Sequence, residues 1–130
     1  MKILVGFRGK NVGQDLLQLA ARRARAFNGE TIVVTSLMGG DKTTREQITE
    51  AEQSLQEAQT FFDRENLPCQ THLLVRGQTA GEDLVNYARE SGAEEIIIGV
   101  KSRSKVGKLL FGSTAQYVIL KAECPVTTVK

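Results

Sequence analysis

The hydrophobic and polar positions of this chain alternate between short apolar runs and longer amphipathic stretches. The runs are rich in β-branched side chains, which is typical of buried β-strands. In the stretches between them, apolar positions recur every three or four residues, as in an α-helix that packs one face on a core. The pattern predicts strands at 2–7, 31–37, 69–75, 96–98 and 126–129, and helices at about 11–27, 44–66, 79–91 and 113–121.

Helix-boundary signals agree with this pattern. Asn11, Thr44 and Thr79 are each followed three residues later by glutamine or glutamate, which is the spacing of a capping box. Gly29 and Gly92 follow the first and third helices, where a left-handed residue commonly ends a helix. These signals place the predicted helices between the apolar runs rather than across them.

Strand and helix therefore alternate strictly along the chain, giving five strands joined by four crossovers. Right-handed crossovers of this kind produce one parallel sheet with helices on both faces. We expect an α/β fold with a five-stranded parallel sheet in the order 3-2-1-4-5 and two helices on each face. Ligands bind such sheets at the carboxyl ends of the strands, where the winding reverses. That crevice lies between the first and fourth strands, and residues 6–9, 98–103 and 112–114 would line it.

The loop between the fourth strand and the last helix carries the clearest candidate chemistry. It contains four cations and no acidic residue, and it ends where the last helix begins. Free N–H groups at a helix N-terminus and clustered cations suit a phosphate ligand. Two alternatives stay open: the cations could cover a solvated surface, and Ser113 could merely cap the helix, because Ser113 and Gln116 also fit a capping box. Neither a P-loop nor a G-x-G-x-x-G motif occurs. The four cations are Lys101, Arg103, Lys105 and Lys108.

Composition narrows the class of protein. The 130 residues, 41% hydrophobic and 25% charged, describe one globular domain over 1–130. A net charge of +2 is too small to indicate nucleic-acid binding, and no apolar stretch suits a membrane span or a signal sequence. Cys69 and Cys124 resemble small core residues rather than a disulfide pair, so we expect a cytoplasmic location. The single histidine, His72, is assigned no catalytic role.

Several segments together resemble the universal stress protein family. Gly99, a gap of twelve residues, Gly112-Ser113 and then the segment 122–126 (Ala-Glu-Cys-Pro-Val) look like the carboxyl half of these proteins. The likeness covers the whole chain, including the start at 2–5 and the segment 93–99 before the loop. It implies a fold of the adenine nucleotide alpha hydrolase-like type, usually a homodimer, with a role in stress resistance.

The family's ATP-binding pattern is glycine, two residues, glycine, nine residues, then glycine with serine or threonine. Gly99 and Gly112-Ser113 match it with the right spacing, and Ser102 replaces the second glycine. The family commonly has an aspartate after the first strand, where this chain has Arg8. An arginine cannot accept a hydrogen bond, so Arg8 could attract more phosphate charge or could block the site.

Carried over by position, the resemblance implies a complete nucleotide site. The Gly99 and Ser113 regions would hold ribose and phosphates, Ser102 and Arg103 would lie at the start of the loop, and Ile98 and Leu37 would flank the adenine. The full set of expected nucleotide-binding residues is Gly6, Phe7, Arg8, Leu37, Ile98, Gly99, Ser102, Arg103, Gly112, Ser113 and Thr114.

We expect a stress-response protein that binds ATP or AMP with little or no turnover. No carboxylate near the loop is placed to activate water, because Glu94 and Glu95 precede a buried strand and are expected on the surface. Mg²⁺ carried by the phosphates would need one or two protein oxygens, and Ser113 is the single candidate. The alternative is a module that binds no nucleotide and acts through unknown protein partners, which Arg8 and Ser102 favour. A true ATPase or kinase is a third reading.

The last strand gives a reason for dimerisation. Residues 126–129 would form an edge strand with unpaired backbone groups, and pairing with a second copy about a two-fold axis would cover that edge. The alternative is a short edge strand left uncovered. We expect a homodimer through Val126 to Val129.

Overall fold

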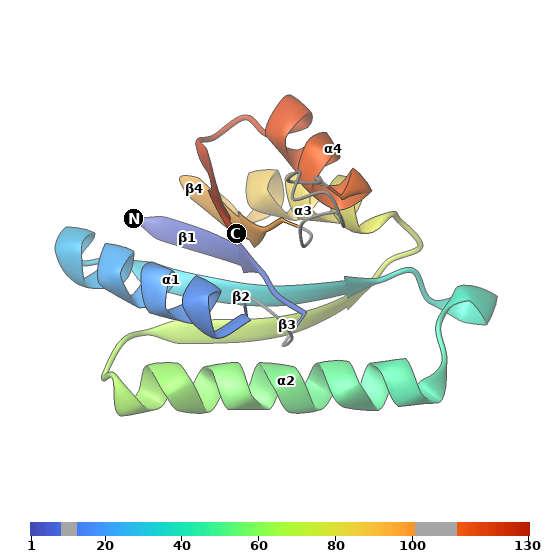
Figure 1. The fold of residues 1–130 in the computed structure, drawn as a ribbon, viewed down its shortest axis with the longest axis horizontal. Coiled ribbons are helices and arrows are strands. Elements are labelled where there is room, and N and C mark those ends of the chain that lie inside the picture. The colour runs from blue at the N-terminus through green and yellow to red at the C-terminus, as the bar shows by residue number, and fades with distance from the viewer. Residues whose placement is uncertain (9–12, 101–111) are drawn as a thin grey trace, which may run out of the picture.

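The computed structural model describes residues 1–8, 13–100 and 112–130. Its helices and strands follow the predicted order, and most of their boundaries fall within two residues of the prediction (Figure 1). The strands are β1 (Lys2–Gly6), β2 (Glu30–Leu37), β3 (Cys69–Val75), β4 (Glu95–Gly99) and β5 (Val126–Val129). The helices are α1 (Gly13–Phe27), α2 (Arg45–Arg64), α3 (Ala80–Ser91) and α4 (Ser113–Lys121), with a short 3₁₀ turn, η1 (Gly40–Lys42), before α2.

The five strands form one parallel sheet in the order β3-β2-β1-β4-β5, which confirms the predicted topology. β1 lies at the centre, with Leu4 opposite Ile32 on one side and opposite Ile96 on the other. A central strand in a parallel sheet is covered on both faces, so it needs a continuous apolar run. Ile3, Leu4 and Val5 are accordingly fully buried.

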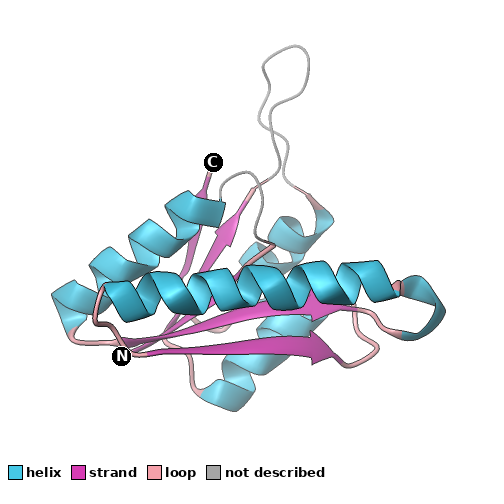
Figure 2. Cartoon of the chain, turned by 90° about the horizontal axis from the view of Figure 1, so that it is seen from below, coloured by secondary structure: helices cyan, strands magenta, loops and turns pink. Residues whose placement is uncertain are grey.

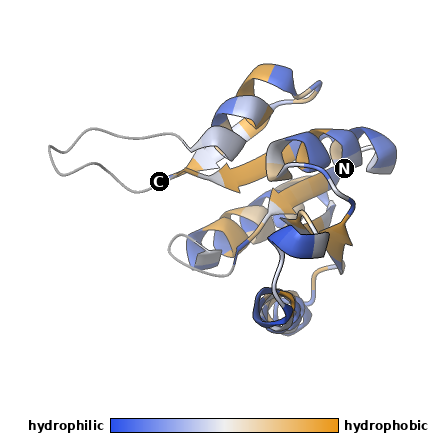
Figure 3. Cartoon of the chain, turned by 90° about the vertical axis from the view of Figure 1, so that its right-hand side faces the viewer, coloured by the Kyte–Doolittle hydropathy of each residue, from blue (hydrophilic) through white to orange (hydrophobic). Residues whose placement is uncertain are grey.

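Two helices cover each face of the sheet, as predicted. Side chains from α1 and α2 pack with Ile3, Val5 and Val33 on one face, and side chains from α3 and α4 pack with Leu4 and Ile96 on the other. Figure 1 shows these pairs on opposite sides of the sheet, and in Figure 2 the long helix α2 lies in front of it. Figure 3, with α2 seen nearly end-on, shows hydrophobic strands at the centre of the molecule and a mostly hydrophilic outer face on α2.

The helix ends follow from local side-chain chemistry at most positions. Thr44 and Thr79 form the predicted capping boxes with Gln47 and Glu82. Gly92 ends α3 in the left-handed conformation, with a φ of 74°. After α1 the left-handed residue is Asn28, with a φ of 50°, so the prediction that glycine takes that position is wrong there.

Gly29 is needed for close packing rather than for a left-handed conformation. A Cβ atom at Gly29 would lie 2.8 Å from the backbone oxygen of Met1, closer than real Cβ atoms approach backbone. Glycine therefore allows the chain to pass beside the start of β1, where the N–H of Glu30 bonds to the same oxygen at 2.9 Å.

The alternative that Ser113 caps the last helix does not hold. Gly112 takes the N-cap position of α4 in an extended conformation, without a side-chain hydrogen bond, and Ser113 is the first helical residue. The first hydrogen bond of the helix runs from the N–H of Gln116 to the oxygen of Gly112 at 3.0 Å. The N–H groups of Ser113, Thr114 and Ala115 are therefore left without helical partners, as at any helix start.

Glu95 differs from the expected surface position. It is only 5% exposed, and its carboxylate accepts a hydrogen bond from Thr127 Oγ1 at 2.6 Å. Arg23 Nη2 lies 3.6 Å from the same carboxylate oxygen. The sequence does not predict this burial, because the partners Arg23 and Thr127 come from α1 and β5. Only the folded sheet brings these elements to the start of β4.

Candidate functional site

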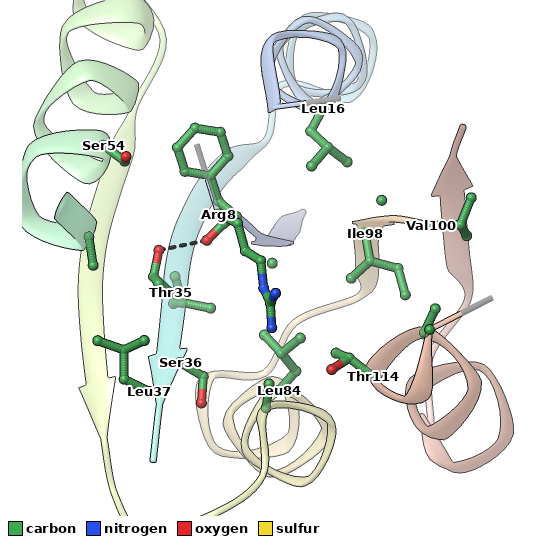
Figure 4. Close-up of a pocket in the computed structure, with 18 of the residues that line it drawn as sticks. Arg8, Leu16, Thr35, Ser36, Leu37, Ser54, Leu84, Ile98, Val100 and Thr114 are labelled. Carbon is green, nitrogen blue, oxygen red and sulfur yellow. Dashed lines mark hydrogen bonds between the residues drawn. The ribbon is translucent and has the colours of Figure 1, made fainter. Parts of the chain in front are cut away.

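A cavity of about 550 Å³ opens at the carboxyl ends of β1, β2 and β4, at the predicted crevice. Ligand-binding pockets in proteins commonly have volumes of this size. Figure 4 shows side chains from the strand ends and the surrounding helices converging on this space. The wall consists of Gly6, Phe7, Arg8, Leu16, Val34, Thr35, Ser36, Leu37, Gln47, Glu50, Ala51, Ser54, Ala80, Leu84, Ile98, Gly99, Val100, Gly112, Ser113, Thr114 and Ala115.

The structure brings most of the predicted site residues into this one wall. The expected residues that line the cavity are Gly6, Phe7, Arg8, Leu37, Ile98, Gly99, Gly112, Ser113 and Thr114. Ser102 and Arg103 lie outside the described residues, as do the three lysines of the basic loop. The predicted crevice is thus present, and the contribution of the loop stays a prediction.

The floor of the cavity is apolar and closely packed. A Cβ atom added to Gly6 would lie 3.0 Å from Leu84 Cδ1 and 3.1 Å from Ile98 Cγ2. Gly6 therefore lets β1 end directly against these two side chains. A flat group such as a nucleobase can rest on a floor of this kind without displacing polar atoms.

One end of the cavity offers hydrogen-bond donors. The N-terminus of α4 faces the cavity through Ser113, Thr114 and Ala115, and no described residue accepts from their N–H groups. The helix dipole adds a partial positive charge at the same place. This geometry stabilises an anion, and a phosphate group fits it without any side-chain ligand.

Arg8 adds a full positive charge to the cavity. Its exposed side chain extends from the end of β1 into the cavity, with the guanidinium group between Ser36, Leu84 and Thr114 (Figure 4). No carboxylate in the described part of the chain forms an ion pair with Arg8. About 550 Å³ of open space is present with this side chain in place, so Arg8 does not fill the cavity.

The opposite wall offers hydrogen-bond acceptors. Thr35 and Ser36, at the carboxyl end of β2, both line the cavity. Thr35 Oγ1 donates to the backbone oxygen of Phe7 at 2.6 Å, and Ser36 Oγ donates to Asp83 Oδ2 at 2.6 Å. Both hydroxyl hydrogens are thus already used inside the protein.

Asp83 belongs to a buried network behind this wall. It is fully buried on α3, and Arg76 holds it through Nη2 at 2.6 Å and Nε at 2.7 Å. Arg76 also bonds to Glu90 at 2.8 Å and lies 5.4 Å from the centre of the Tyr87 ring. Burial alone would lower the pKa of Arg76, but the hydrogen bonds to Glu90 and Asp83 raise it above the ordinary value.

Sequence reasoning missed Thr35, Ser36 and the α2 residues that line the cavity. Gln47, Glu50 and Ser54 reach it from the first half of α2, whose sequence shows only an amphipathic helix. The signal for β2 was available, because two hydroxyl residues interrupt its apolar run just where a carboxyl end was predicted. No comparable signal existed for α2, because its position over the crevice is a tertiary feature.

Nothing among the described residues forms a metal centre. No group of three or more histidine, cysteine, aspartate or glutamate side chains converges in that part of the chain. Glu50 is the one carboxylate among the described residues that line the cavity. The described wall thus offers hydrogen-bond donors on one side and acceptors on the other.

The two cysteines lie far from this cavity and from each other. Cys69 starts β3 and Cys124 precedes β5, so they belong to opposite edges of the sheet. Four strand spacings correspond to about 19 Å, well beyond the reach of a disulfide. Burial, and then the charge of Asp63, raise the pKa of the Cys69 thiol to about 12, and burial also raises the pKa of Cys124. Neither thiol is a ready nucleophile.

The fold and the cavity together define a Rossmann-like α/β protein with a cavity at the carboxyl edge of its parallel sheet, which is the edge where folds of this class bind ligands. A model of the universal stress protein family matches residues 1–130. The structure is similar to that of a universal stress protein from Archaeoglobus fulgidus, with a TM-score of 0.91 and 39% identity, covering 99% of this chain and 97% of the other. The chain belongs to the universal stress protein family.

Two further comparisons also match universal stress proteins. A universal stress protein from Archaeoglobus fulgidus in complex with dAMP is 35% identical, with a TM-score of 0.84 over 99% of this chain and 96% of that chain. A universal stress protein from Mycolicibacterium smegmatis is 43% identical over 54 residues, so the match spans 42% of each chain. In the described part of the chain, no helix is both long and apolar enough to cross a bilayer.

Proposed function

We propose that this protein binds an adenine nucleotide, AMP or ATP, in the cavity at the carboxyl edge of the sheet. The observation that carries the proposal is the polarity of the cavity: uncapped N–H groups lie at one wall, acceptors lie at the other, and the guanidinium of Arg8 and an apolar floor lie between them. A nucleotide has matching parts, with an anionic phosphate, a flat base, and hydroxyl or amine donors. The dAMP complex of a relative 35% identical to this chain supports the assignment.

Each part of the nucleotide has a proposed position. The phosphates lie at the N-terminus of α4, held by N–H groups of Ser113 and Thr114 and by Arg8. Ile98 and Leu37 flank the base, and Gly6, Phe7, Gly99 and Gly112 allow close approach of the backbone. From the sequence, Ser102 and Arg103 complete the phosphate end.

The protein is proposed to hold its nucleotide with little or no turnover. Glu50 is the one carboxylate in the described wall, and it lies on α2, away from the proposed phosphate end. Mg²⁺ fits as a companion of the phosphates, with the Ser113 hydroxyl as its protein ligand, since Mg²⁺ bound to nucleotides needs few protein oxygens. An ATPase predicts phosphate release that disappears in Ser113→Ala.

Thermal unfolding with and without nucleotide tests the proposal. A ligand at 100 times its dissociation constant adds about 2.7 kcal/mol to the free energy of unfolding. For a domain of this size that raises Tm by several degrees. AMP, and ATP with Mg²⁺, are expected to produce such a shift at millimolar concentration, whereas no shift with either would reject the proposal.

A second candidate function is a protein-interaction module that binds no nucleotide. It is favoured by Arg8 at the position of the family's aspartate and by the exposed apolar side chains of α4, where Leu120 is 78% and Ile119 is 44% exposed. Under this reading Arg8 excludes nucleotide rather than attracting it. Nucleotide titration of the variant Arg8→Ala separates the two candidates.

We also propose that 1–130 acts as one domain in a cytoplasmic homodimer. β5 is an edge strand, and its free side would pair with the copy of Val126 to Val129 in a second chain. Cys69 and Cys124 lie at opposite edges of the sheet and cannot pair, and burial raises the pKa of both thiols. Two unpaired cysteines of this kind suit a reducing compartment. Sedimentation at micromolar concentration tests the dimer, and a monomer would reject it.

A further inference from the structure

The two hydroxyl groups in the β2 wall of the cavity can face a ligand in only one way. A hydroxyl has one hydrogen to donate and two lone pairs that accept. Thr35 uses its hydrogen on the backbone oxygen of Phe7, and Ser36 uses its hydrogen on Asp83, each at 2.6 Å. Toward the cavity, both oxygens are therefore acceptors.

The direction of the Ser36 hydroxyl is fixed by groups behind the wall. Asp83 is fully buried, and Arg76 holds its carboxylate through two short contacts of 2.6 and 2.7 Å. A carboxylate paired with a guanidinium group has no hydrogen to give back, so Ser36 must be the donor of the pair. Hydrogen bonds to a charged acceptor are also the stronger kind. The Ser36 hydroxyl thus cannot turn its hydrogen into the cavity without leaving a buried charge undersatisfied.

We propose that Ser36 is a specificity-determining residue that selects a ligand with a hydrogen-bond donor on its nucleoside part. Asp83 and Arg76 are positioning residues, which set the polarity of Ser36 from outside the cavity. The inference rests on the proposed nucleotide-binding function and adds a selection rule to it. The donor is either the exocyclic amine of adenine or a hydroxyl of the sugar.

The selection rule follows from the cost of an unmatched acceptor. A ligand that presents an N–H or O–H group to Ser36 completes a hydrogen bond. A ligand with a carbonyl oxygen at that place sets lone pair against lone pair, and a ligand lacking the group leaves the Ser36 oxygen unpaired. Sites that read a polar group in this way discriminate strongly against analogues without it.

Calorimetric titration with four nucleotides tests this rule. The probes are AMP, its 2′-deoxy and 3′-deoxy forms, and IMP, which has a carbonyl where AMP has its amine. The wild-type protein should bind AMP about tenfold more tightly than at least one of the other three. Ser36→Ala should abolish that preference by weakening each nucleotide that carries the group read by Ser36, while the nucleotide that lacks this group keeps its affinity. Ser91→Ala is the matched control, because its hydroxyl bonds to Ala88 at the end of α3, outside the cavity, and should preserve the preference.

Asp83→Asn is the sharper variant. Arg76 needs an acceptor at Oδ1, so the amide oxygen should stay toward Arg76 and the NH₂ group should face Ser36. That NH₂ group would donate to Ser36 Oγ and release the Ser36 hydrogen toward the cavity. If Ser36 reads the adenine amine, the preference for AMP over IMP should invert. If it reads a sugar hydroxyl, which both donates and accepts, AMP should keep its affinity within a few-fold.

The outcomes separate this inference from the proposed function. If the wild type binds AMP but Ser36→Ala weakens all four nucleotides equally, or none of them, the selection rule is overturned and nucleotide binding stands. If the wild type binds none of the four, both are overturned. Thermal unfolding of each variant confirms that it is folded, and Ser36→Ala alone decides the matter if Asp83→Asn does not fold.

Discussion

The two ends of the central sheet differ in how their polar groups are satisfied. At the amino end, strand starts bond to neighbouring segments: the N–H of Glu94 bonds to Lys2 at 2.8 Å, and the N–H of Ile96 bonds to Pro125 at 3.0 Å. The buried carboxylate of Glu95 pairs there with Thr127 and Arg23. At the carboxyl end, the N–H groups that start α4 and the guanidinium group of Arg8 face a cavity instead. The amino end thus pairs its polar groups within the protein, whereas the carboxyl end leaves donors facing a cavity.

This difference has a physical cause in the direction of the strands. All strands are parallel, so every crossover helix begins at the carboxyl edge, and helix N-termini with their unpaired donors gather there. The amino edge receives helix C-terminal ends and strand starts, which the chain can pair with each other. Substitutions at the two ends should therefore affect different measurements, stability at one end and ligand affinity at the other.

The largest effect is expected for Glu95→Ala at the amino end. The variant removes the partner of Thr127 and of the half-buried Arg23, and it should lower the free energy of unfolding by about 2–3 kcal/mol. The control is Arg25→Ala, which breaks an ion pair with Glu65 on the surface and should cost less than about 1 kcal/mol. Urea unfolding measures both. An unchanged midpoint in Glu95→Ala would show that the two ends do not differ in this way.

Ser113→Asp should separate stability from binding. A negative charge in the first turn of α4 should stabilise the helix by about 0.5 kcal/mol, because it complements the dipole. The same charge occupies the proposed phosphate position and should weaken AMP binding by at least about tenfold, because the carboxylate repels the phosphate and competes with it for the N–H groups. Arg45→Asp, at the first position of α2 and outside the cavity wall, is the control that should leave affinity unchanged. If Ser113→Asp and the wild type bind AMP equally, the proposed position of the phosphate at the N-terminus of α4 is wrong.

Arg8→Ala tests whether the positive charge at the carboxyl end of the sheet attracts a nucleotide or obstructs it. If Arg8 attracts phosphate, the variant should bind ATP several-fold to tenfold more weakly, with a smaller loss for AMP, because fewer charges are involved. The loss should shrink at high salt, since exposed charges are screened. Arg22→Ala, on the exposed side of α1, is the matched control. Stronger binding by Arg8→Ala would instead show that this side chain obstructs the cavity.

The smallest effect concerns Cys69 at the amino end. Its pKa is about 12 in the folded protein, raised by burial and by Asp63 from an ordinary value near 9. The unfolded chain therefore loses this proton first, and the thiol's contribution to stability is fully present below pH 9 and is lost as pH rises toward 12. Cys69→Ala should reduce that alkaline loss of stability. Iodoacetamide at pH 8 should label Cys69 at least about tenfold more slowly in the folded than in the unfolded protein.

Local patterns were sufficient to predict the elements and their order. Apolar runs such as Ile96-Ile97-Ile98 and the capping boxes at Thr44 and Thr79 depend on residues close in sequence, so the chain shows them directly. Strict alternation of strand and helix then restricts the topology to a few arrangements. The family likeness placed Gly99 and Ser113 at the same site, and both line the cavity.

The sequence by itself thus determined the strands, the helices, the parallel sheet and the edge at which the cavity opens. Only the tertiary structure decided that Glu95 is buried, that α2 contributes Gln47 and Ser54 to the cavity, and that Asp83 and Arg76 fix the hydroxyl of Ser36. The physical reason is the sequence distance over which each effect acts. Periodicity and capping act over one or two helical turns, whereas burial and hydrogen-bond direction depend on residues that only the folded sheet brings together.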